Sequence, residues 1–183
     1  MNNQPVSFNI PVVGFIAQLS GVGKTTLITR LLPIFLEKNI RVAVVKHTHH
    51  DFTVDQPGKD SYEMRKAGAK QTIIASPYRI ASIQEFPDTK QEPDLATCLA
   101  RIDTSNIDLV IVEGFKHAVY PKIEVYREPH STRFLYTDDK NIIALVSNIA
   151  TSSKCTLAQM DIDNPSQVAN FLITTFKLNR RYE

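Results

Sequence analysis

The stretch Pro11–Leu27, PVVGFIAQLSGVGKTTL, contains the strongest structural signal in the chain. Its first part, Pro11–Ala17, is apolar and partly β-branched, which is typical of a strand covered on both faces. A glycine-containing turn follows and leads into a helical pattern of apolar residues. This order of strand, turn and helix predicts an α/β protein whose first strand lies inside a parallel sheet.

The turn between that strand and that helix has the composition of a loop that binds polyphosphates. Its glycines allow backbone N–H groups to line a concave turn, and the following helix N-terminus adds a positive dipole. We expect Lys24 to reach the β- and γ-phosphates and the Thr25 hydroxyl to bind Mg²⁺. The predicted phosphate-binding residues are Gly21, Val22, Gly23, Lys24, Thr25 and Thr26.

Gln18 stands where the full P-loop pattern, G-x-x-x-x-G-K-[ST], has a glycine. A side chain at this position can narrow the loop, or it can contact the nucleotide itself. The part of the motif that cradles the phosphates is nevertheless whole, so the P-loop interpretation stands.

A second buried strand is predicted over Asp108–Val112, DLVIV, and it is followed by Glu113. Ligands of open α/β sheets bind at the carboxyl ends of the strands. A carboxylate at that edge, close to the P-loop, suits a bound Mg²⁺, which prefers oxygen ligands. We therefore predict a magnesium site formed by Thr25 and Glu113.

A histidine-rich segment, KHTHHD over Lys46–Asp51, lies at the carboxyl end of Arg41–Lys46, which is also predicted to be a buried strand. Zinc is the less favoured interpretation, because the loop offers no obvious fourth ligand. Imidazoles beside phosphates can also donate hydrogen bonds or respond to the γ-phosphate. We predict that His49, His50 and Asp51 contact the nucleotide or a substrate, with a polar surface as the remaining alternative.

Two other segments bear on ligands. The basic loop that starts at Gly58 and leads into a helix can hold a second anion, or it is an ordinary capped helix with a solvated face. Ser147-Asn148 ends a strand where many GTP-binding proteins have Asn-Lys-x-Asp, but that motif is absent here. These letters alone therefore do not predict which base is bound.

The remaining pattern predicts a P-loop NTPase fold with a mostly parallel central sheet, helices on both faces and an additional antiparallel hairpin. No internal repeat or long linker is present, so residues 1–183 are expected to form a single domain. The helix after the P-loop contains Pro33, which is expected to kink or shorten it. Strands are expected at 11–17, 41–46, 71–76, 79–84, 108–112, 122–126 and 142–147, and further helices at 61–67, at 93–102 and from Asn164-Pro165 onward.

Composition excludes several classes of protein. The chain has 21 Lys and Arg against 19 Asp and Glu, which is too balanced to indicate nucleic acid or an anionic membrane as a partner. No apolar run reaches the ~18–20 residues of a membrane span. The two cysteines, Cys98 and Cys155, form no C-x-x-C pair and suggest a reducing compartment. We therefore expect a cytoplasmic protein.

The blocks SGVGKTTL, KHTHHDFTVDQPGKDSYEMRKAGA, QTIIAS and DLVIVEGFKH, in this order, resemble the MobB family of molybdopterin-guanine dinucleotide biosynthesis adapter proteins. The resemblance covers about residues 11–150, and the second block is far more specific than the P-loop. It implies a homodimeric protein that binds GTP and Mg²⁺ and supports the attachment of GMP to molybdopterin. The family also lacks the glycine at the position of Gln18.

By motif position, the resemblance implies phosphate contacts from the P-loop residues Gly21 to Thr26 and magnesium contacts from Thr25 and Glu113. It leaves the role of the cluster His47–His50 undefined. The implied partners are a molybdopterin guanylyltransferase, molybdopterin itself and a second copy of the chain. Self-association also has weak support from the residues, since the hairpin at 71–84 and the strand at 122–126 are expected to leave sheet edges that need cover.

Two functions remain open at this point. The first is a GTP-binding adapter with slow, Mg²⁺-dependent GTPase activity at most, serving a separate nucleotidyltransferase. The alternative is a small-molecule kinase that holds its substrate with Lys59, Arg65 and the histidine loop. A kinase of this size usually has an arginine-bearing lid over the phosphates, and the sequence shows no such lid helix. The sequence therefore favours the adapter.

Overall fold

A computed structural model describes residues 5–48, 51–86, 92–129, 131–150 and 155–178. The chain forms two compact units. Met1–His47 together with Pro93–Glu183 is called the sheet unit below, and Thr48–Glu92 is called the hairpin unit. The organisation of residues 1–183 as a single domain stays a prediction.

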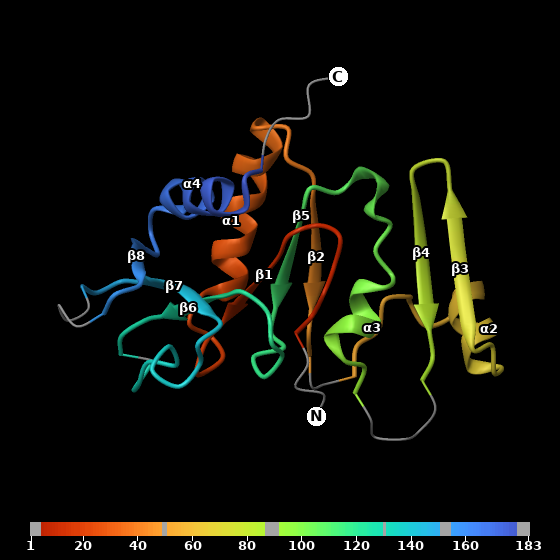
Figure 1. The fold of residues 1–183 in the computed structure, drawn as a ribbon. Helices are drawn as coiled ribbons and strands as arrows, with labels where there is room; N and C mark the ends of the chain where they lie inside the picture. The colour runs from red at the N-terminus through yellow and green to blue at the C-terminus, as the bar shows by residue number, and fades with distance from the viewer. Residues whose placement is uncertain (1–4, 49–50, 87–91, 130, 151–154, 179–183) are drawn as a thin grey trace. The chain divides into compact units, whose positions relative to one another are not determined.

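The sheet unit is built on a six-stranded parallel sheet in the order β2-β5-β1-β6-β7-β8. The central strands are fully or almost fully buried, as the apolar runs of β1 and β5 predicted. Figure 1 shows the strands β1, β2 and β5 side by side. The bounds are β1 Val12–Ile16, β2 Val42–Lys46, β5 Leu109–Glu113, β6 Lys122–Tyr126, β7 Ile142–Ser147 and β8 Ala158–Asp161.

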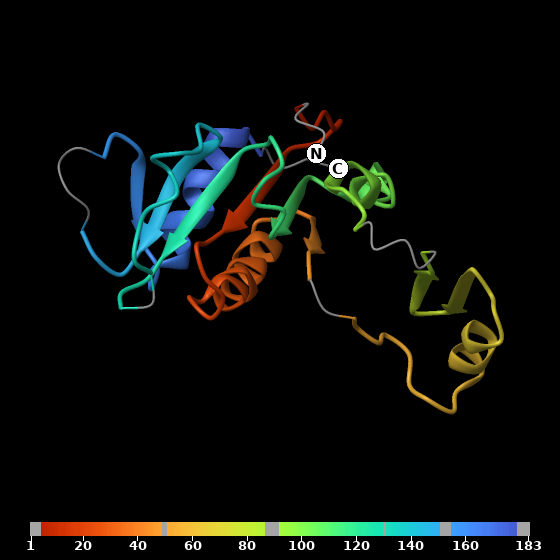
Figure 2. The same cartoon turned by 90° about the horizontal axis from the view of Figure 1, so that it is seen from below.

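Helices cover both faces of this sheet, as predicted. Helices α1 (Lys24–Glu37) and α4 (Pro165–Phe176) pack in one hydrophobic core, while α3 (Leu95–Leu99) packs in another. Because side chains alternate along a strand, Val12 faces the α3 core and Val13 faces the α1 core. Figure 2 shows α1 and α3 on opposite sides of β1 and β5. None of the helices in the described part of the chain is long and apolar enough to cross a bilayer.

The ends of the helices differ from the sequence expectations at three places. Pro33 does not end α1, which runs on to Glu37. Asp94 caps α3 by accepting a hydrogen bond from the Thr97 N–H at 2.8 Å, so Pro93 precedes the cap instead of opening the helix. In the hairpin unit, the helix begins at Asp60, one residue before the expected start at 61. The start of α4 is as predicted, with Asn164 as the cap and a proline at the first helical position.

The strands also differ in three respects. β2 lies at an edge of the sheet, and Val44 is 46% exposed, so this strand is not fully buried as expected. β6 lies between β1 and β7, so the strand at 122–126 leaves no edge. β8 was not predicted, because only Met160 of its four residues is buried and its sequence has no apolar run.

The hairpin unit consists of helix α2 (Asp60–Lys66), strand β3 (Gln71–Ser76) and strand β4 (Arg79–Gln84). The strands form the predicted antiparallel hairpin, with Ser76 opposite Arg79 at the turn (Figure 1). Arg65 joins the elements of this unit: its guanidinium pairs with Asp55 at 2.9 Å and with Glu85 at 3.1 Å. The Asp55 side chain is almost fully buried, so this pair lies inside the unit.

Candidate nucleotide site

The loop Ala17–Gly23 joins β1 to α1 and has the backbone shape that its glycines predicted. Gly21 and Gly23 have φ values of 79° and 102°, in the left-handed region that glycine tolerates best. Gly23 is the N-cap of α1, where no side chain caps the helix and the first turn holds no acidic residue. The first N–H groups of a 14-residue helix therefore face this loop with the dipole favouring an anion.

Thr25 and Glu113 meet at the carboxyl end of the sheet, as the sequence predicted. The Thr25 hydroxyl donates to the Glu113 carboxylate, at 2.8 Å to Oε1 and 3.0 Å to Oε2. The parallel pairing of β1 with β5, which places Phe15 opposite Glu113, brings these distant residues together. A hydroxyl and a carboxylate are both oxygen ligands of the kind that Mg²⁺ prefers, so the two residues fit a magnesium site.

Lys46 is the third member of this cluster. It ends β2, opposite Glu113 in the sheet, and its Nζ lies 3.5 Å from the Glu113 Oε2 and 3.5 Å from the Thr25 Oγ1. Its side chain is 57% exposed, so the ammonium group can exchange the carboxylate for another anion.

Lys24 lies over the loop that precedes it. Its Nζ donates to the Leu19 carbonyl at 3.4 Å. Burial lowers the pKa of Lys24, and the positive charges of Lys46 and Lys116 lower it further, while Glu113 opposes them. The charges that act on Lys24 are therefore those of two other lysines and a single carboxylate, Glu113. Positive charge is in excess at this site.

His47 is held directly beside Glu113. Its backbone N–H donates to the Glu113 carbonyl at 2.9 Å, and its ring stacks on Phe115 with 4.3 Å between the ring centroids. Gly114 makes this approach possible, because it has a φ of 106° and a Cβ there would lie 2.8 Å from the His47 Cβ. The first histidine of the cluster therefore contributes to the packing of the site's edge.

The predicted contacts of the other residues of the histidine loop, His49, His50 and Asp51, stay a prediction. His49 and His50 lie outside the described residues. Asp51 is exposed and belongs to the hairpin unit. Across the described ranges, no group of three or more His, Cys, Asp or Glu side chains is arranged to hold a metal ion.

The amide of Gln18 is used to fix a neighbouring segment of the chain. Its Oε1 accepts hydrogen bonds from the backbone N–H groups of Thr132 at 2.9 Å and Arg133 at 3.2 Å. The residue that departs from the P-loop pattern thus anchors the β6–β7 connection to the start of the P-loop.

Of the residues proposed for a kinase substrate, Arg65 is engaged within the hairpin unit. Arg65 is tied to two carboxylates, and these hydrogen bonds hold its pKa above the usual value. Lys59 is exposed at the start of the seven-residue helix α2.

Asn148, at the place of the missing base-reading motif, forms hydrogen bonds with Glu128. Its side-chain amide accepts from the Glu128 N–H at 2.9 Å and donates to the Glu128 carbonyl at 3.2 Å.

Two cations near the P-loop were missed by the sequence analysis. Arg127, directly after β6, lies against Gly23, with its Nε 3.9 Å from the position of a Cβ on that glycine. This Nε is buried and has no hydrogen-bond partner among the described residues. Lys116 follows β5 by three residues and acts on Lys24. Their places just after predicted parallel strands were the available signal, since such ends share one edge of the sheet.

The chain is similar to several characterised proteins. The profile of the family described as Molybdopterin guanine dinucleotide synthesis protein B, MobB, matches residues 12–148. The molybdopterin-guanine dinucleotide biosynthesis adapter protein of Escherichia coli (strain K12) is 45% identical over 166 residues, which cover 90% of this chain and 92% of that protein. The adapter protein of the same description from Haemophilus influenzae is 40% identical over 172 residues, covering 94% of this chain and 90% of that protein.

Solved structures give the same assignment. A crystal structure of molybdopterin-guanine biosynthesis protein B has a TM-score of 0.68 at 30% identity and covers 90% of this chain and 99% of that one. The crystal structure of Bacillus subtilis MobB, at 22% identity and a TM-score of 0.69, shows the same fold. The match over residues 12–148, together with the identity to relatives along almost their whole length, means that the chain belongs to the MobB family.

Proposed function

We propose that this chain is a GTP-binding adapter of molybdopterin-guanine dinucleotide biosynthesis, with slow Mg²⁺-dependent GTPase activity at most. The observation that carries the proposal is the Thr25–Glu113 contact beside Lys24, at the end of a helix whose first turn is free of acids. The relatives at 45% and 40% identity are described as adapter proteins of this biosynthesis.

The geometry suits an adapter better than the transferase itself. A guanylyltransferase must expose the α-phosphate to attack and expel pyrophosphate. A P-loop instead encloses the β- and γ-phosphates between a lysine and a helix N-terminus. Nucleotide retention with slow loss of the γ-phosphate is the chemistry that this arrangement supports.

Each site residue has a defined role in the proposal. The loop Gly21–Thr26 donates N–H groups to the phosphates, and Lys24 neutralises their charge. Thr25 and Glu113 hold Mg²⁺, which would offset charge between the phosphates when bound. His49, His50 and Asp51 are assigned to contact with the nucleotide or the partner, because imidazoles beside phosphates can donate hydrogen bonds. The choice of GTP rests on the guanine dinucleotide in the relatives' descriptions, since no Asn-Lys-x-Asp motif is present and Asn148 is engaged with Glu128.

The proposed partners are a separate molybdopterin guanylyltransferase, molybdopterin and a second copy of the chain. A homodimer is supported by the edge position of β2 in its sheet and by an exposed apolar face of the hairpin. On that hairpin face, Ile73 and Ile80 are 64% and 75% exposed. A cytoplasmic location is part of the proposal and agrees with Cys98 and Cys155 being free thiols.

A transfer assay tests the adapter role. The protein is incubated with Mg²⁺, α-labelled GTP and molybdopterin, with and without the separate transferase. We expect no labelled dinucleotide from this protein alone and a higher yield when it is added to the transferase. The Lys24→Ala variant should lose the stimulation, while Lys140→Ala, which changes an exposed lysine, should retain it. Label in the pterin product of the protein alone would identify it as the transferase and refute the adapter.

A further inference from the structure

A cavity of about 420 Å³ opens in the sheet unit between the β5–β6 connection and the β6–β7 connection. Ile16, the last residue of β1, forms part of its wall, so the cavity begins at the strand that leads into the P-loop. Cavities of about 300–1,000 Å³ are the usual size for small-molecule sites. The lining contains His117 and the charged residues Lys116, Lys122, Arg133, Asp138 and Asp139.

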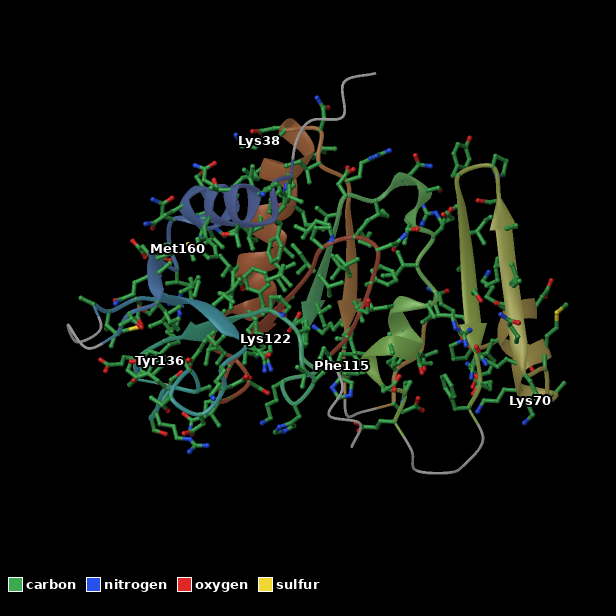
Figure 3. All side chains as sticks on the ribbon, viewed as in Figure 1. Lys38, Lys70, Phe115, Lys122, Tyr136 and Met160 are labelled. Carbon is green, nitrogen blue, oxygen red and sulfur yellow. The ribbon has the colours of Figure 1, made fainter. Side chains whose placement is uncertain are left out.

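The cavity is held in shape by a buried lysine. Lys122, labelled in Figure 3, donates to the carbonyls of Lys116 at 2.9 Å and Ala118 at 2.8 Å and forms an ion pair with Asp139. Its side chain is 1% exposed. The hydrogen-bonding capacity of this ammonium group is therefore used within the protein, and it fixes one connection to the other.

The rim of the cavity is cationic and open to a ligand. Lys116 and His117 are exposed. Arg133 pairs with Asp138 at 3.5 Å, with both side chains about two-thirds exposed. An ion pair so exposed is weak, so the Arg133 side chain can leave Asp138 and bind an anionic ligand. The Asp138 carboxylate can then accept hydrogen bonds from N–H groups of the same ligand.

Two links connect this rim to the P-loop. Gln18, in the P-loop segment, accepts hydrogen bonds from the backbone of Thr132 and Arg133. Lys116 lies close enough to Lys24 for its charge to lower the pKa of that lysine. A molecule in the cavity therefore lies beside the end of the site that is expected to hold the terminal phosphates.

We propose that this cavity is a second ligand site, which binds a phosphorylated pterin next to the nucleotide on the P-loop. The phosphate ester binds Lys116 and Arg133, since a guanidinium and an ammonium group are the usual partners of such an anion. The amino-pyrimidine edge of the pterin donates to the Asp138 carboxylate, and Leu135, a partly exposed apolar residue of the lining, contacts the flat ring. This inference rests on the proposed function, which requires the protein to meet a pterin substrate.

Binding is measured by pterin fluorescence, using the phosphate ester of 6-hydroxymethylpterin as the probe and the full chain with Mg²⁺-GTP. Unphosphorylated 6-hydroxymethylpterin is the matched ligand control. We expect the double variant Lys116→Ala, Arg133→Ala to bind the phosphorylated probe about tenfold or more weakly. The unphosphorylated probe should bind weakly and equally to the wild type and the double variant. Lys140→Ala, in the same connection but outside the cavity, should match the wild type.

Equal binding of the phosphorylated probe by the wild type and the double variant would overturn the inference. So would no binding by a wild-type protein that still binds GTP. A wild-type protein that does not bind GTP would instead refute the proposed function. Failure of the pterin site and failure of the proposed function are therefore distinguishable. Because Lys116 and Arg133 are exposed, both substitutions should leave the fold intact, which circular dichroism checks.

Discussion

The sheet unit and the hairpin unit differ in how much apolar side chain each buries within itself. The sheet unit has two hydrophobic cores, one on each face of its sheet. In the described part of the hairpin unit, by contrast, Asp55 is the only buried residue. Helix α2 buries no side chain, and the unit is joined by a β-ladder and by the ion pairs of Arg65.

This contrast indicates which unit depends on a partner. A two-stranded hairpin is at best marginally stable alone, and exposed apolar surface usually marks an interaction site. Ile73 and Ile80 share one face of the hairpin, because their register places Ile73 opposite Ser82 and Ala75 opposite Ile80. We therefore expect substitutions in the two cores of the sheet unit to lower the free energy of unfolding. Substitutions on the exposed face of the hairpin unit should instead affect binding of a partner.

The largest effect should come from the core of the sheet unit. Phe35, on α1, is fully buried, while its neighbour Leu36 is 75% exposed. Phe35→Ala should lower the free energy of unfolding by about 3–5 kcal/mol through lost burial and a new cavity. Leu36→Ala should change it by less than about 0.5 kcal/mol. Urea unfolding measures the free energy of unfolding of both variants. Equal decreases in the two variants would contradict the core described above.

The next effect concerns the buried ion pair between Lys122 and Asp139. Lys122→Met leaves the Asp139 carboxylate without its cation, which should cost about 3 kcal/mol at neutral pH, since Asp139 is partly exposed. The control is Lys140→Met, on the surface, which should have little effect. A Lys122→Met protein as stable as the wild type would show that this pair is dispensable.

The same pair predicts a pH dependence. Burial opposes the ionisation of Asp139, but hydrogen bonds from Lys122 and Asn141 outweigh it and lower the pKa of the carboxyl group. A lowered folded-state pKa stabilises the protein above the unfolded value near ~4, and this stability is lost as the pH falls through the folded value. The wild type should thus lose more stability below about pH 4 than Lys122→Met does.

An intermediate effect should appear in nucleotide affinity. Lys24→Ala removes the mobile cation aimed at the β- and γ-phosphates, which should weaken Mg²⁺-GTP binding by about 1.5–3 kcal/mol, or about ten- to a hundredfold. Calorimetry measures the affinity, with Lys140→Ala as the charge-matched control. Unchanged affinity in a folded Lys24→Ala protein would contradict the nucleotide site.

The smallest effect on unfolding should come from the exposed face of the hairpin. The double variant Ile73→Ser, Ile80→Ser should change the free energy of unfolding of the isolated chain by no more than about 0.5 kcal/mol per site. If the proposed dimer forms through this face, the double variant should shift it towards the 20.6 kDa monomer in light scattering. Tyr78→Ser, at the turn of the same hairpin, is the control. A double variant that remains a dimer would place the interface elsewhere.

Much of the fold was predictable because its signals are local. Apolar runs predicted most of the strands, and the sequence Asn164-Pro165 predicted the start of α4. β8 gave no such signal, because its assignment depends on pairing with β7 and only Met160 is buried. The exposure of β2 was also unpredictable, since its sequence resembles that of an interior strand and only the strand order places it at an edge.

The candidate site shows the same division. The sequence by itself determined the phosphate loop, because glycines, Lys24 and Thr25 are neighbours in the chain, and it predicted Glu113 through the rule that parallel strands end at one edge. Only the tertiary structure decided the partners of Gln18, the position of Arg127 against Gly23 and the burial of Lys122. The physical reason is that these contacts join segments far apart in sequence, and a polar side chain has no periodic pattern that reveals which distant carbonyl or carboxylate will satisfy it.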